Sequence, residues 1–84
     1  MTQPAHTHDL KSELEKSAAL LRTLRDEILV QIHLGALEAK SEWDRLEPRL
    51  ENALESARQD VSERSRIALA DAMQAARRFR ESLR

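Results

Sequence analysis

Apolar and small residues recur every eleven positions along nearly the whole chain, and this period most constrains what the chain can fold into. The first series comprises Leu10, Leu21, Ile32, Trp43, Leu54, Ser65 and Ala76. The second series comprises Ser17, Ile28, Ala39, Leu50, Val61, Ala72 and Leu83. The third series comprises Glu13, Leu24, Gly35, Leu46, Ala57, Ala68 and Phe79. At about 100° per residue the three series lie within an arc of roughly 80°, which predicts long amphipathic α-helices.

A seven-residue repeat describes the same residues less well. A heptad seam through Leu14, Leu21 and Ile28 continues to Gly35 and then to Glu42, where it fails. Eleven residues over three turns, about 3.67 per turn, favour nearly straight or slightly right-handed packing. In period and composition this pattern is similar to the repeats of exchangeable apolipoproteins and of some desiccation-related proteins, with no shared motif.

Length and composition agree with an all-α protein. The 84 residues allow one domain, and a chain this short buries only about 60% of its unfolded surface, so partner chains are an expected source of further burial. Ala, Leu, Glu and Arg dominate, glycine occurs once, and the only aromatic residues are Trp43 and Phe79. Such an A/E/L/R-rich composition is typical of coiled coils and long helices.

Pro48 is the strongest interruption of the helical pattern. Inside a helix a proline costs about 3 kcal/mol, whereas in the first turn this penalty largely disappears. The sequence therefore predicts one helical domain over residues 9–84, after a disordered tail at residues 1–8. We expect helix one at about 9–46 and helix two at about 47–83. The eleven-residue phase runs through Pro48, so both a hairpin and a kinked continuous rod stay open.

A second apolar surface opposes the main stripe in the middle of helix one. Val30, Leu34 and Leu37 follow an i, i+4, i+7 spacing on the side away from Ile28. A helix that is apolar on both sides is usually covered by more than one neighbour, and a close helix approach would explain Gly35. This pattern predicts a bundle made by several chains, as a homo-oligomer (dimer or tetramer). The predicted oligomer interface consists of Leu21, Leu24, Ile28, Val30, Ile32, Leu34, Gly35, Leu37, Trp43, Leu46 and Leu50.

No pattern for catalysis or cofactor binding occurs in the chain. There is no glycine-rich phosphate loop and no arrangement of a nucleophile with a base. His6 and His8 lack the further ligands that a structural metal site needs, and His33 lies on a mainly polar face without a Glu-x-x-His element. We therefore predict a non-enzymatic protein with no catalytic, cofactor-binding or metal-binding residues and no cofactor.

The C-terminus is rich in arginine. Arg77, Arg78, Arg80 and Arg84 could contact an anionic partner, although positive charge also suits the C-terminal end of a helix. The whole chain has a net charge of −1, which disfavours a purely electrostatic nucleic-acid binder. This cluster is therefore the only predicted contact site for an anionic partner.

The sequence predicts a self-associating structural or protein-interaction module, with another helical protein as a further partner. One alternative is an apolipoprotein-like amphipathic protein on a membrane or lipid surface. Another is an architectural nucleic-acid binder that uses the Arg-rich C-terminus. The N-terminal residues do not resemble a signal peptide, and the most apolar stretch is too short to span a membrane, so we expect a cytoplasmic protein.

Overall fold

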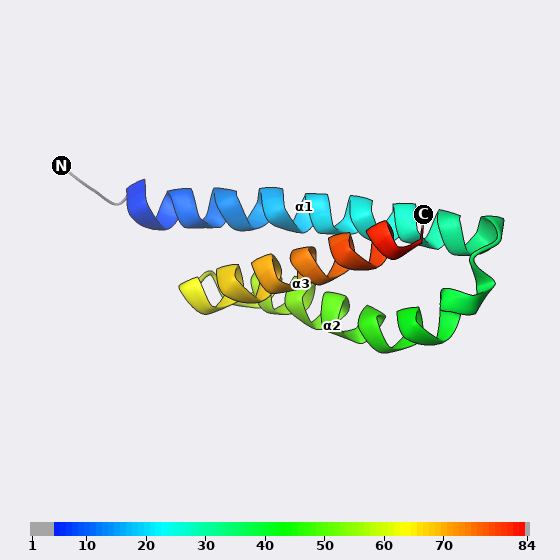
Figure 1. Cartoon of the computed structure of the whole chain (residues 1–84). Helices are drawn as coiled ribbons and strands as arrows, with labels where there is room; N and C mark the ends of the chain where they lie inside the picture. Colours follow the sequence, from blue (N-terminus) through cyan, green and yellow to red (C-terminus); the bar gives the residue numbers. More distant parts are fainter. Residues whose placement is uncertain (1–4, 84) are drawn as a thin grey trace.

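The computed structural model describes the backbone of residues 5–83 and the side chains of residues 9–83. Three α-helices pack side by side into a bundle that measures 53 × 17 × 15 Å (Figure 1). Helix α1 spans Ala5–Leu34, α2 spans Lys40–Gln59 and α3 spans Glu63–Ser82, and the short 3₁₀ helix η1, Leu37–Ala39, precedes α2. The described residues contain no strand, so the prediction of an all-α fold is confirmed for them. Of the tail predicted at residues 1–8, positions 1–4 lie outside the described residues and 5–8 belong to α1.

Helix α2 runs antiparallel to α1, and α3 runs parallel to α1 (Figure 1). Two ion pairs between α1 and α3 show that these helices are parallel and in a constant register. Arg66 lies 4.0 Å from Glu13, and Arg80 donates a 2.7 Å hydrogen bond to Glu27, so both pairs join residues 53 positions apart. Exposed pairs of this kind contribute only about 0–1 kcal/mol each, so they report the register more than they stabilise it.

Most members of the three eleven-residue series lie in the core of this single chain, whereas Glu13, Gly35 and Val61 are exposed. In the first series Leu10 is partly buried, and every later member, from Leu21 to Ala76, is buried. Trp43 is only 1% exposed, and its ring packs near that of Phe79. The predicted apolar stripe is therefore confirmed as the buried face, and α1, α2 and α3 of one chain supply its partners.

The structure differs from the sequence prediction at Pro48, which lies in the interior of α2 and not at a helix boundary. Residues 5–83 form three α-helices instead of the two predicted, and the chain turns at residues 35–39 and 60–62. The proline removes the helical hydrogen bond to the Asp44 carbonyl. Both Pro48 and Asp44 are exposed, so water can hydrate that carbonyl and α2 continues through the proline.

Helix α1 ends in a Schellman motif. The amide of Ala36 donates to the carbonyl of Gln31 (3.2 Å), and the amide of Gly35 donates to that of Ile32 (3.3 Å). Gly35 has a φ of +151°, which side-chain-bearing residues rarely adopt. The single glycine of the chain therefore ends α1 and allows the chain to turn toward α2.

Serine side chains form the second turn. The Ser62 hydroxyl accepts a 3.2 Å hydrogen bond from the Ser65 amide and so caps the N-terminus of α3. The same hydroxyl donates to Asp60 at 2.8 Å. Ser65 is fully buried, and its hydroxyl donates to the Ser56 carbonyl at 3.2 Å. These bonds join the end of α2 to the start of α3.

Candidate interaction surfaces

The eleven residues predicted for the oligomer interface divide into two sets in the structure. Six lie in the core of the single chain, and Leu46 is partly buried against that core. The buried six are Leu21, Leu24, Ile28, Ile32, Trp43 and Leu50. The remaining four, Val30, Leu34, Gly35 and Leu37, are exposed. Because α2 and α3 cover the main stripe of α1, the burial of the first set needs no second chain.

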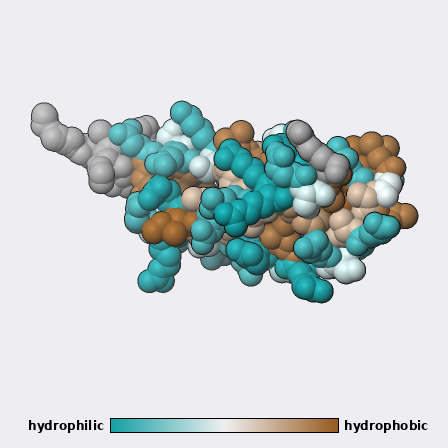
Figure 2. Space-filling model, viewed as in Figure 1, coloured by the Kyte–Doolittle hydropathy of each residue, from teal (hydrophilic) through white to brown (hydrophobic). Residues whose placement is uncertain are grey.

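The exposed apolar residues Val30, Leu34 and Leu37, which we call the outer patch, lie at the end of the bundle where α1 passes into η1. Their exposed fractions are 55%, 79% and 70%. Hydrophobic surface gathers at this end of the molecule (Figure 2). Contiguous exposed apolar surface of this kind often marks a site of interaction.

Gly35, beside the outer patch, has a different role from the one that the sequence suggested. A Cβ atom added at this position would meet nothing within 4 Å, so no helix of the described chain approaches it closely. Its positive φ is the reason for a glycine here. The backbone conformation alone accounts for the glycine at the end of α1, and a close approach by a helix of another chain stays a prediction.

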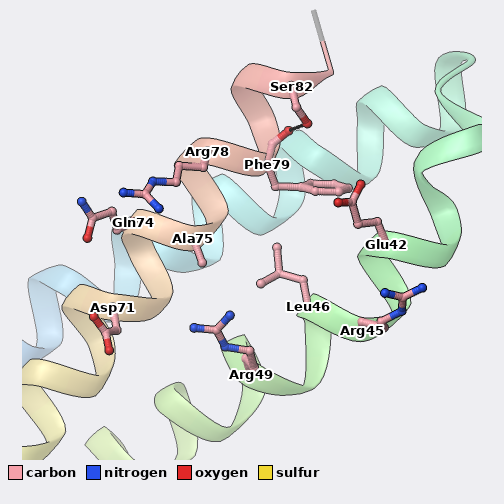
Figure 3. Close-up of a pocket in the computed structure, with 10 residues that line it drawn as sticks. All are labelled: Glu42, Arg45, Leu46, Arg49, Asp71, Gln74, Ala75, Arg78, Phe79 and Ser82. Atoms are coloured by element: carbon pink, nitrogen blue, oxygen red, sulfur yellow. Dashed lines mark hydrogen bonds between the residues drawn. The ribbon is translucent and has the colours of Figure 1, made fainter.

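A groove runs between α2 and α3, lined by these two helices alone; we call it the α2–α3 groove. The part near the α1–α2 connection has a volume of about 590 Å³ and the adjoining part about 410 Å³, and Arg49 and Asp71 line both. Leu46 projects toward α3, and the Phe79 ring projects from α3 toward α2 (Figure 3). The apolar floor consists of Leu46, Ala53, Ala68, Ala72, Ala75 and Phe79. Alanines leave space for a further helix to approach closely.

Positive charge predominates at the rim of the α2–α3 groove. Four arginines and two carboxylates line it: Arg45, Arg49, Arg64, Arg78, Glu42 and Asp71. Among the described residues, Arg45, Arg49 and Arg78 form no ion pair. This groove was not predicted from the sequence, because Arg45, Arg49 and Arg64 are far in sequence from the Arg-rich C-terminus. The four-residue spacing of Arg45 and Arg49 was the available signal, since it places both on one face of a helix.

The structure describes three of the four arginines predicted to contact an anionic partner. Arg80 bonds Glu27 of α1, whereas Arg77 and Arg78 are exposed, and Arg78 lines the α2–α3 groove. Arg84 lies outside the described residues. Contact of these arginines with an anionic partner stays a prediction.

The groups with clearly shifted pKa values belong to exposed ion pairs. Hydrogen bonding from Arg58 lowers the pKa of Glu55, and the bond to Asp44 raises the pKa of Lys40. The pKa of Arg66 is raised by its hydrogen bond to Glu63. All these groups are solvent-exposed and join neighbouring turns of a helix, so they indicate surface pairing.

Across the described part of the chain, no cluster of three or more His, Cys, Asp or Glu side chains is arranged to hold a metal ion. No helix within residues 5–83 combines the length and apolarity needed to cross a membrane.

Comparisons of the chain with protein-family models, with curated proteins and with solved structures found no match.

Proposed function

We propose that this chain is a non-enzymatic helical module that self-associates through the outer patch. The observation that carries the proposal is that Val30, Leu34 and Leu37 remain 55–79% exposed although the chain already encloses its core. Fully burying a valine or leucine side chain stabilises a structure by roughly 1.5–3 kcal/mol. Contact of the outer patch with another molecule would recover part of that energy.

The two alternative functions have less support. A lipid-bound form would use the main apolar stripe, but Leu21, Ile28 and Ile32 of that stripe are buried within the chain. A lipid surface would therefore have to open the bundle. A nucleic-acid binder would use the C-terminal arginines, but Arg80 already donates a hydrogen bond to Glu27. Self-association requires neither rearrangement.

Sedimentation velocity over a concentration series tests the proposal. We expect the wild type to show a mass above that of one chain, and Val30→Asp with Leu34→Asp to sediment as a monomer. Both residues are exposed, so the helical circular dichroism should not change. Ile67→Asp is the matched control because Ile67 is 52% exposed, close to Val30, but belongs to α3. A double variant with the mass of the wild type would overturn the proposal.

A further inference from the structure

We infer that the α2–α3 groove of one copy receives the outer face of α1 from a second copy, so that assembly proceeds head to tail. This inference rests on the proposed function and specifies which surface receives the outer patch. In each contact the α1 helix of the second copy would add a fourth helix beside α2 and α3. Recognition of this kind, an amphipathic helix in a groove, uses apolar anchors spaced i, i+3, i+4 and i+7.

The dimensions of the α2–α3 groove suit a helix. Its lining extends from Glu42 to Ser56 on α2 and from Arg64 to Ser82 on α3. At 1.5 Å per residue these stretches are about 21 Å and 27 Å long, which is room for four to five turns. Val30 and Leu34 lie one turn apart at the end of α1, and Leu37 follows in η1 after the turn at Gly35, so these side chains fit within this length.

The charges of the two surfaces are complementary. Residues 26–38, which contain the outer patch, hold three carboxylates and no lysine or arginine. The groove rim holds four arginines against two carboxylates. Within the described chain Glu27 bonds Arg80 and Asp26 lies 3.7 Å from Arg25, whereas Glu38 is exposed and forms no ion pair. Glu38 would therefore face the arginines of the groove rim in a second copy.

The two surfaces cannot meet within one chain. Val30 and Leu34 of the outer patch lie on the side of α1 opposite Ile28 and Ile32, which face the core, whereas no residue of α1 lines the α2–α3 groove. Figure 3 shows the groove open on the side away from α1, which passes behind it. After the first contact, one copy would keep its groove free and the other copy would keep its outer patch free. Such heterologous contacts produce rings or open chains instead of a closed dimer.

Complementation between two variants tests this arrangement. The face variant carries Val30→Asp and Leu34→Asp, and the groove variant carries Arg49→Glu and Arg78→Glu. We expect each variant alone to be monomeric, with the dissociation constant raised about tenfold or more. An equimolar mixture should form a species of two chains, because one intact groove and one intact outer patch remain. That complex would also show that both variants are folded.

The matched control carries Arg22→Glu and Arg77→Glu, an equal change of charge at exposed arginines that do not line the groove. It should assemble like the wild type, into species larger than a dimer as concentration rises. If the groove variant also assembles like the wild type and the mixture gives no two-chain complex, the groove assignment is overturned while self-association through the outer patch stands. A wild type that stays monomeric at every concentration would overturn both.

Discussion

The indole of Trp43 and the phenyl ring of Phe79 meet between α2 and α3, with ring centroids 5.9 Å apart and ring planes inclined by 35°. These are the only two aromatic residues of the chain. Tilted pairs at this separation contribute about 0.5–1.5 kcal/mol beyond the apolar area that they bury. Phe79 also forms part of the floor of the α2–α3 groove, so the core and the proposed docking surface share a residue.

Truncation of this aromatic pair should strongly destabilise the bundle. Phe79→Ala leaves a cavity beside Trp43, and we expect the free energy of unfolding to fall by about 3–5 kcal/mol. Urea unfolding followed by the fluorescence of Trp43, the single tryptophan, measures this change. Ile67→Ala, at a residue that is 52% exposed, should cost much less. Equal losses in the two variants would show that Phe79 is not a core residue.

Gly35→Ala should destabilise the protein through the backbone alone. Alanine at a φ of +151° is strained, whereas its Cβ would meet no neighbour within 4 Å. We expect a cost of about 1–3 kcal/mol in thermal or urea unfolding. Ala36→Gly, one residue later, serves as a control for added flexibility in the same turn. An unchanged stability of Gly35→Ala would mean that α1 does not end in the Schellman motif described.

Pro48→Ala should stabilise the chain. Alanine restores the amide that can donate to the Asp44 carbonyl and removes the clash of the proline ring within α2, a gain of up to about 3 kcal/mol. The melting temperature should rise and the helical circular dichroism should not fall. Pro48→Gly, which restores the amide but has poor helix propensity, should gain less. A loss of stability in Pro48→Ala would instead place a helix boundary at the proline, as the sequence suggested.

Ser62→Ala removes the cap of α3 and should cost about 1 kcal/mol. Ser65→Ala removes a buried hydroxyl that donates to the Ser56 carbonyl, which keeps the Asp60 amide as a donor, so we expect the loss typical of one hydrogen bond, about 0.5–1.5 kcal/mol. Urea titrations of both variants give these values. Ser41→Ala, at an exposed serine of α2, is the control and should change stability by less than about 0.5 kcal/mol. If Ser62→Ala and Ser65→Ala were both as stable as Ser41→Ala, the serine hydrogen bonds described for this turn would be wrong.

The Glu55 carboxyl should titrate below its usual pKa of 4.5, because Arg58 donates hydrogen bonds to its ionised form. A lowered folded pKa means that this pair stabilises the fold above pH 4.5 and that the contribution is lost as the pH falls through the lowered value. Carbon-13 NMR of the side-chain carboxyl groups measures the midpoint. Arg58→Gln should move it back toward 4.5. Identical midpoints in the two proteins would show that the pair does not form in solution.

The buried face was predictable because burial repeats with the helical period. Leu54, Ser65 and Ala76 lie 11, 22 and 33 residues after Trp43, and all four are buried. Ser65 was placed in the core by its position alone, against its polarity. The period tells which side of a helix is buried, but it does not tell which chain covers that side. The core residues of one chain therefore resembled an oligomer interface.

The positions of the two turns were harder to predict than the buried face. A proline in a helix interior has a large intrinsic cost, so Pro48 outweighed the weaker signals at Gly35 and Ser62. Both signals were present, because glycine commonly ends a helix and serine commonly starts one. Pro48 and Asp44 are both exposed, and this exposure depends on how the helices pack. The α2–α3 groove was missed for the same reason, since it exists only once Arg49 and Arg78 lie on neighbouring helices.

The absolute mass of the wild-type chain, measured by small-angle X-ray scattering over a concentration series, tests the central claim most directly. Self-association through Val30, Leu34 and Leu37 predicts a mass above the 9.6 kDa of one chain that rises with concentration. A mass of 9.6 kDa at every concentration, with a radius of gyration near the 14.6 Å of the single bundle, would contradict it.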